Sequence, residues 1–99
     1  MQSQSCSVLI QFEAIAGKEG ALEQSLLALI EPTVKEAGCI YYHFHKSQND
    51  PAKFMFYETW NSEEAFNNHL ASKHVQSWLA IKDDLLAKPF DISLWTPRQ

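Results

Sequence analysis

Two histidines occupy positions in which a protein could use them to move a proton. His69 and His74 flank a helical corner at which Ser72 is expected to cap the second helix. An imidazole with a pKa of about 6.5 can accept a proton near neutral pH. His74 would lie in the first turn of that helix, where the positive end of the helix dipole favours the neutral ring. The position therefore favours a neutral ring that can accept a proton, and the alternative for each histidine is a hydrogen-bonded, partly buried side chain without a catalytic role.

Glu58 is a carboxylate in an unusual position. In the predicted strand 53–60 it shares a face with Phe54, Phe56 and Trp60. An ionised carboxylate buried among aromatic rings is costly unless it is paired or hydrogen-bonded. We therefore expect Glu58 to orient and tune one of the histidines. The alternative is that strand curvature leaves Glu58 in water near the edge of the sheet.

Metal binding is a second chemistry open to histidines. His43 and His45 lie on one face of a predicted strand, but no third ligand follows from the spacing. His69 and His74 are five positions apart, so on a continuous helix their side chains diverge. The sequence therefore predicts no metal site.

The two cysteines, Cys6 and Cys39, each lie near the start of a predicted strand and could be neighbours in space. In a reducing compartment such residues are free thiols. No charged residue flanks either one, so neither is predicted to be a catalytic nucleophile.

The elements that hold these residues follow from the spacing of the apolar side chains. Residues 7–15 alternate as a strand does, and residues 18–37 repeat apolar side chains at helical spacing. Pro32 falls inside this helix, where a proline removes one backbone hydrogen bond and costs about 3 kcal/mol. We expect a kink or a break near residues 28–31.

A β-hairpin follows Gly38, the residue expected to end the helix because glycine takes a positive φ without strain. Apolar and polar side chains alternate from Cys39 onward, residues 47–51 form the turn, and the return strand covers residues 53–60. A short helix capped by residues 61–64 carries Phe66 and His69 on one face. A second helix is predicted from about Lys73 to residue 87, and the last strand begins at residue 89.

The order strand, helix, strand, strand, helix, strand indicates one α+β domain over residues 1–99, with its core at 7–95. This is the ferredoxin-like βαββαβ arrangement, an antiparallel sheet with helices on one face. The other face carries Met55, Tyr57 and Thr59 and needs a cover. A chain with 45% hydrophobic residues and a small core favours a homodimer, in which two sheets pack as a dimeric α+β barrel.

Charge and hydropathy exclude two classes of partner. The net charge is −4 and no Lys/Arg cluster occurs, so nucleic acid is not the expected partner. No apolar run is long enough to span a membrane, and the first five residues lack the pattern of a signal peptide. We expect a cytoplasmic protein.

A set of motifs spread over residues 7–95 carries a resemblance to a known family. They are Glu36-Ala-Gly-Cys-Ile, Tyr42, Asp50-Pro51, Phe54, Tyr57-Glu58-x-Trp60, Ser62-x-Glu64-Ala65 and His69-x-x-x-x-His74. The set resembles the antibiotic biosynthesis monooxygenase domain family, above all its small stand-alone members described as quinol monooxygenases. On the family motif fall Glu58, Trp60, His69 and His74, with Tyr42 on the strand beside them.

The resemblance implies a ferredoxin-like dimer with a pocket in each subunit between sheet and helices. It also implies oxidation of a phenol or hydroquinone by O₂ without metal, flavin or haem, so no cofactor is expected. His74 or His69 would be the base and Glu58 would orient it. The substrate ring would lie in a dry aromatic cavity, and we expect its walls to be Trp60, Tyr42, Phe56 and Phe66.

Two departures and two other functions stay open. Lys73 stands where many relatives have proline, which leaves the aim of His74 open. A related group degrades haem with an asparagine on the first strand, but this chain has Gln11 and no asparagine there, so haem is not the expected substrate. A similar fold could isomerise a small phosphorylated carbonyl compound by proton transfer, although only scattered lysines are present to hold a phosphate. A dimer that binds a small molecule without catalysis is the remaining possibility.

Overall fold

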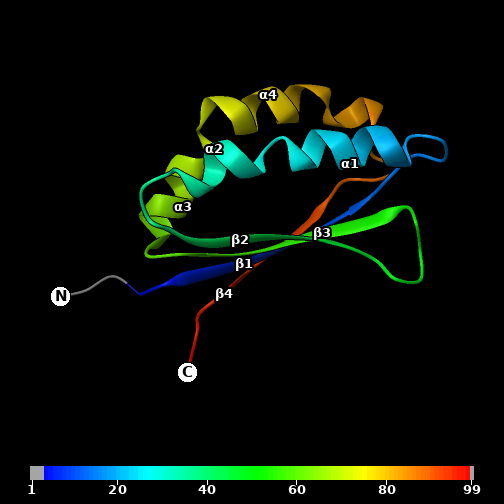
Figure 1. The fold of residues 1–99 in the computed structure, drawn as a ribbon. Helices are drawn as coiled ribbons and strands as arrows, with labels where there is room; N and C mark the ends of the chain where they lie inside the picture. Colours follow the sequence, from blue (N-terminus) through cyan, green and yellow to red (C-terminus); the bar gives the residue numbers. More distant parts are fainter. Residues whose placement is uncertain (1–3, 99) are drawn as a thin grey trace.

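The computed structural model describes residues 4–98, and four strands form an antiparallel sheet in the order β2-β3-β1-β4. Helices cover one face of this sheet (Figure 1). The arrangement confirms the predicted ferredoxin-like α+β fold. The elements are β1 (Cys6–Glu13), α1 (Glu19–Leu27), α2 (Ile30–Val34), β2 (Cys39–Lys46), β3 (Lys53–Trp60), α3 (Glu63–Leu70), α4 (Lys73–Ile81), the 3₁₀ turn η1 (Lys82–Asp84) and β4 (Asp91–Trp95).

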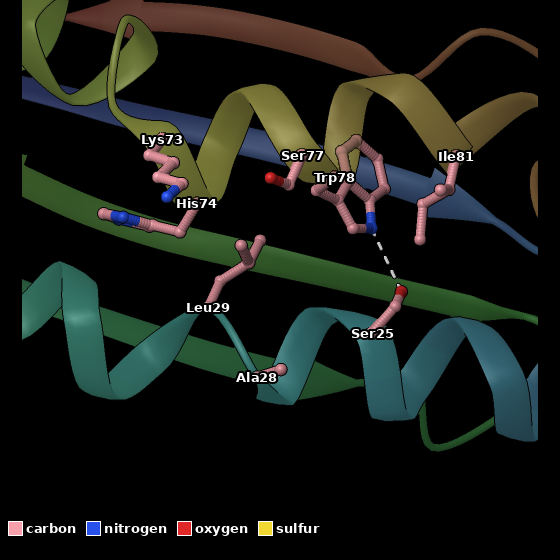
Figure 2. A pocket seen from close by; sticks show the side chains of 8 residues that line it. All are labelled: Ser25, Ala28, Leu29, Lys73, His74, Ser77, Trp78 and Ile81. Carbon is pink, nitrogen blue, oxygen red and sulfur yellow. Dashed lines mark hydrogen bonds between the residues drawn. The ribbon is translucent and has the colours of Figure 1, made fainter.

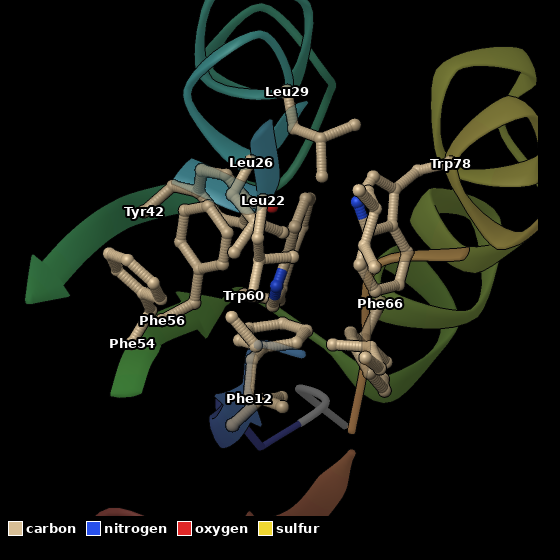
Figure 3. Close-up of a cluster of buried hydrophobic side chains, with 14 of the residues drawn as sticks. Phe12, Leu22, Leu26, Leu29, Tyr42, Phe54, Phe56, Trp60, Phe66 and Trp78 are labelled. Carbon is tan, nitrogen blue, oxygen red and sulfur yellow. The ribbon is translucent and has the colours of Figure 1, made fainter. Parts of the chain in front are cut away.

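The helix-facing side of the sheet forms the core. Strand β3 lies between β1 and β2, so Glu58 is flanked by Val8 on one side and Tyr42 on the other. The Glu58 side chain is therefore fully buried in the middle of the sheet, and the alternative of a wet edge position is wrong. Aromatic side chains from the sheet and leucines from α1 fill the space between the layers (Figure 3).

The predicted break in the first helix is confirmed at Ala28 and Leu29, between α1 and α2. Pro32 has no N–H to donate to the carbonyl of Ala28, so the helical ladder is interrupted one turn before the proline. The break lets α2 lie beside β2 and close to α3 (Figure 1). It places Thr33, which is fully buried, at the helical corner that carries the two predicted histidines.

Two serines cap the helices α3 and α4, as predicted. The Ser62 Oγ accepts a hydrogen bond from the Ala65 N–H at 3.1 Å and begins α3. The Ser72 Oγ accepts one from the Val75 N–H at 3.4 Å and begins α4. Because two separate helices meet here, side chains on α3 and α4 can point toward each other.

The second helix is shorter than predicted, because α4 ends at Ile81 and not near residue 87. The chain beyond it pairs with the end of β1 instead of continuing the helix. The Ile15 N–H donates to the Leu85 carbonyl at 2.9 Å, and the Ala87 N–H donates to the Glu13 carbonyl at 2.9 Å. Tertiary pairing therefore overrides the local helical pattern.

The two cysteines are free, as predicted, and they flank one tryptophan. Cys6 on β1 and Cys39 on β2 both pair with Trp60, from opposite sides of β3. The width of that strand separates them, so they are neighbours of Trp60 and not of each other. Within residues 4–98, the helices are too short or too polar to cross a bilayer.

Gly38 provides a test of the turn between α2 and β2. Its φ is +89°, and a Cβ built there would lie 2.6 Å from the Ala65 Cβ and 2.7 Å from the Asn61 Oδ1. We predict that Gly38→Ala lowers the free energy of unfolding by about 2 kcal/mol or more, from backbone strain and overpacking. Urea denaturation measures the change.

Gly20→Ala is the matched control for this prediction. Gly20 lies in α1 with nothing within 4 Å of a built Cβ, so alanine should keep or raise stability by up to about 1 kcal/mol. Equal midpoints for Gly38→Ala and the unchanged protein would show that this turn tolerates a side chain.

Candidate active site

Glu36 brings the two predicted histidines together. It lies in the turn between α2 and β2, and its Oε2 is 2.6 Å from the His69 Nδ1 and 2.9 Å from the His74 Nε2. His69 comes from the last turn of α3 and His74 from the first turn of α4. The expectation that these histidines diverge is wrong, because the chain turns between them at Ala71 and Ser72.

Glu58 does not have the predicted partner. Its Oε1 accepts a hydrogen bond from the Trp60 Nε1 at 2.9 Å, and its Oε2 has no hydrogen-bond partner among residues 4–98. The carboxylate that bonds the imidazoles is Glu36. The prediction that Glu58 orients a histidine directly is therefore wrong. The sequence did contain a signal for Glu36, because this residue begins the Glu36-Ala-Gly-Cys motif.

Burial dominates the electrostatics of Glu58 and its neighbours. It raises the pKa of Glu58 to about 7, a shift that the Trp60 hydrogen bond opposes and the charge of Glu36 reinforces. Burial, followed by the charge of Glu58, also raises the pKa of Tyr42 well above its ordinary range. The sheet side of the site thus favours neutral groups.

The hydrogen bonds fix which nitrogen of each imidazole carries a hydrogen. An ionised carboxylate can only accept, so the His69 Nδ1 and the His74 Nε2 donate to Glu36. Burial lowers the pKa of His69, against the opposing effect of Glu36, and favours its neutral form. In neutral rings this leaves the His69 Nε2 and the His74 Nδ1 as lone-pair acceptors.

Hydroxyl groups complete the surroundings of His74. The Thr33 Oγ1 lies 3.1 Å and the Ser72 Oγ 3.4 Å from the His74 Nε2. The side chain of His69 is 4% exposed, that of Glu36 17% and that of His74 21%. His74 is therefore the member of the cluster with the best access to solvent and to a ligand.

A groove of about 550 Å³ runs between α1 and α4, within the size range of small-molecule sites. Figure 2 shows His74 and Lys73 at one end of it and Ile81 at the other. The Trp78 Nε1 donates to the Ser25 Oγ at 3.0 Å, which fixes the indole against the groove. The lining residues are Ser25, Ala28, Leu29, Lys73, His74, Ser77, Trp78 and Ile81. Of the predicted site residues, all within the described chain, His74 alone lines it.

The four predicted wall residues are packed in the core instead (Figure 3). The rings of Tyr42 and Phe56 stack at 4.3 Å, and Trp60 and Phe66 are almost fully buried. The indole of Trp60 lies 4.7 Å from the ring of His69, measured between centroids. The prediction of a dry cavity walled by these four residues is therefore wrong for residues 4–98, because side chains of α1 and the sheet fill the space.

Comparisons with known proteins agree on one family. The model of the antibiotic biosynthesis monooxygenase family matches residues 6–80. The Synechocystis protein named "Uncharacterized protein sll1783" is 33% identical over 66 residues, which are 67% of this chain and 45% of that protein. The chain thus spans less than half of that relative. "Putative monooxygenase Rv0793" of Mycobacterium tuberculosis is 29% identical over 91 residues, 92% of this chain and 89% of that protein.

Solved structures show the same fold. PA3566 from Pseudomonas aeruginosa superposes with a TM-score of 0.93 at 26% identity, over 100% of this chain and 99% of that chain. SO0527 from Shewanella oneidensis superposes with a TM-score of 0.91 at 28% identity, over 96% of this chain and 92% of that chain.

Proposed function

This chain belongs to the antibiotic biosynthesis monooxygenase family, and from that premise we propose that it oxidises a small phenol or hydroquinone with O₂, using His74 as the proton acceptor. The reaction needs no cofactor in this proposal, as the family resemblance implies. One observation carries the proposal: His74 both lines the groove and forms a hydrogen bond with Glu36. A substrate in the groove can then meet an oriented base.

The Nδ1 of His74 is the proposed proton acceptor. Glu36 accepts the hydrogen bond from the Nε2–H, which fixes the tautomer and the orientation of the ring, as carboxylates do for histidines in other sites. His69 is a positioning residue, because it binds the same Oε2 from the buried side. Glu58 acts indirectly. It accepts the hydrogen bond from the indole of Trp60, and His69 packs against that indole.

The proposed reaction starts with transfer of one phenolic proton to His74. The anion passes one electron to O₂, which gives a semiquinone radical and superoxide, and their combination forms a carbon–oxygen bond. Cleavage of the O–O bond then leaves a hydroxylated quinone, and the proton held by His74 leaves with the second oxygen as water. One hydroquinone and one O₂ thus give one hydroxyquinone and one H₂O. Leu29 and Trp78 supply apolar walls for the ring.

Oxygen uptake with a panel of hydroquinones and phenols tests this function, with ¹⁸O₂ and mass spectrometry of the product. The proposal expects one labelled oxygen in the product and one in water. Conversion of a phosphorylated carbonyl compound without oxygen uptake would favour the isomerase instead. Binding of the panel without any turnover would favour the non-catalytic dimer.

A homodimer is part of the proposal. The sheet face opposite the helices, here called the open face, exposes large apolar side chains, including Tyr57 at 38% and Trp95 at 60%. Apolar patches of this kind mark interfaces between proteins. A second copy that packs its open face on this one would form the α+β barrel.

The molar mass, measured by light scattering as the protein elutes from a size-exclusion column, tests the dimer. The unchanged chain should have twice its chain mass, and Tyr57→Asp on the open face should shift it to the monomer. Val34→Asp is the matched control, because Val34 is 50% exposed on α2, on the helix side of the sheet. A monomeric mass for the unchanged chain would contradict the dimer.

A further inference from the structure

We propose that Glu36, His69 and His74 form a binding site for a divalent transition-metal cation such as Zn²⁺, and that metal binding switches off the proton-acceptor function of His74. The first part stands on the geometry of the cluster alone. The second part rests on the proposed function. Together they make the corner between α3 and α4 an inhibitory metal site.

The donor set is one that Zn²⁺ uses. Two imidazole nitrogens and one carboxylate oxygen lie within 4.8 Å of one another. Two histidines and one glutamate hold catalytic zinc in several hydrolases, and two histidines with one carboxylate also hold iron(II). The three donors come from a turn and two helix ends, so no single regular element fixes their separation.

The distances require only a small expansion. The carboxylate oxygen is 2.6 Å and 2.9 Å from the two nitrogens, which are hydrogen-bond lengths. Donors that share a tetrahedral zinc at about 2.0 Å lie about 3.3 Å apart. The carboxylate oxygen must therefore move away from the His69 Nδ1 by about 0.7 Å and from the His74 Nε2 by about 0.4 Å as the metal replaces the shared hydrogens.

The surroundings suit an ion that keeps one open position. The Thr33 Oγ1 and the Ser72 Oγ lie 3.1 Å and 3.4 Å from the His74 Nε2, where they can bond to a metal-bound water. The cluster is mostly buried, but His74 lines the groove between α1 and α4. An ion can thus enter from the groove and exchange its remaining ligand there.

Metal binding and base catalysis exclude each other at His74. A neutral imidazole has one hydrogen and one lone pair. A metal on the Nε2 takes the lone pair there, so the hydrogen moves to the Nδ1, the atom proposed to accept the substrate proton. Zn²⁺ should therefore inhibit oxygen uptake, because the metal-bound His74 has no lone pair left to accept the proton of the substrate.

Titration calorimetry on the tag-free, full-length chain with Zn²⁺ tests the site, with Co²⁺ as a spectroscopic probe. We expect one ion per chain and a visible Co²⁺ spectrum of a low-coordinate nitrogen and oxygen site. His74→Ala and Glu36→Gln should each weaken binding by about 100-fold or more, since even groups that only orient ligands cost 10- to 100-fold. Circular dichroism checks that both variants are folded.

The double variant His43→Ala/His45→Ala is the matched control, because both histidines lie on the open face, away from the cluster. It should bind Zn²⁺ as the unchanged chain does. Binding that is lost in this control, or kept in His74→Ala and Glu36→Gln, would overturn the site. So would an unchanged chain that shows no binding at a Zn²⁺ concentration of about 1 mM, the weak end of specific affinities.

Activity separates this inference from the proposed function. Bound Zn²⁺ with undiminished oxygen uptake would overturn the inhibitory role. A chain that binds Zn²⁺ through the cluster but oxidises no member of the quinol panel would end the proposed function and leave the metal site intact.

Discussion

Replacing His74 by alanine lowers kcat for oxygen-dependent oxidation of an accepted quinol by about 10²- to 10⁴-fold, the range expected when a general base is removed. His74 lines the groove and its Nδ1 is the lone-pair nitrogen left after Glu36 binds the Nε2–H. Steady-state oxygen uptake measures the loss. Because His74 is partly exposed, the variant should remain folded.

Glu36→Gln separates orientation from proton transfer. The amide keeps the size of the carboxylate but loses the charge that stabilises the protonated His74 during turnover. We expect kcat to fall by about 10- to 100-fold with little change in KM, as for groups that orient a functional histidine. The control is Asn68→Ala, which removes an exposed side chain next to His69 on α3 and should leave kcat unchanged.

For the first of these variants, full activity in His74→Ala would contradict the assignment of His74 as the base.

The second large effect concerns stability and pH. Burial raises the pKa of Glu58 to about 7 in the folded protein, from 4.5 for the free side chain. Between these values the folded state holds a proton that the unfolded state has lost, so the free energy of unfolding falls as pH rises. A difference of about 2.5 pKa units corresponds to about 3 kcal/mol, and the whole cost is present above the folded pKa.

Glu58→Gln should remove this pH dependence. Glutamine can still accept the hydrogen bond from the Trp60 Nε1, but it cannot ionise. The variant should therefore gain about 3 kcal/mol relative to the unchanged protein between about pH 4 and about pH 8. Urea denaturation at both pH values measures it, and the contributions of other titrating groups cancel in the difference. A gap between the two proteins that does not change with pH would contradict a raised pKa at Glu58.

Local signals in the sequence were enough for most of the fold. The alternation of side chains and the turn before residue 53 placed β3 at its observed bounds, Lys53–Trp60. Pro32 predicted the break between α1 and α2, and Ser62 and Ser72 predicted where α3 and α4 begin. The end of α4 could not be predicted in this way, because it depends on the pairing of Ala87 with Glu13, which are far apart in the chain.

The site was harder to predict because its contacts are not local. The histidines were found from their type and spacing, but their partner Glu36 precedes His69 by 33 positions and His74 by 38. Glu58 was the more conspicuous acid, since it stands among aromatic residues of one strand. The groove depends on how α1 and α4 lie side by side, which neither helix pattern contains. The aromatic residues near Glu58 were apolar enough to line a cavity, but the same property packs them into the core.

A crystal structure with a phenol that O₂ oxidises only slowly would test the pairing of groove and base most directly. We predict that the ring lies between Leu29 and Trp78, with its oxygen at about 2.6–3.2 Å from the His74 Nδ1. A phenol bound on the open face or inside the core, with the His74 Nδ1 in contact with solvent only, would contradict the proposed site.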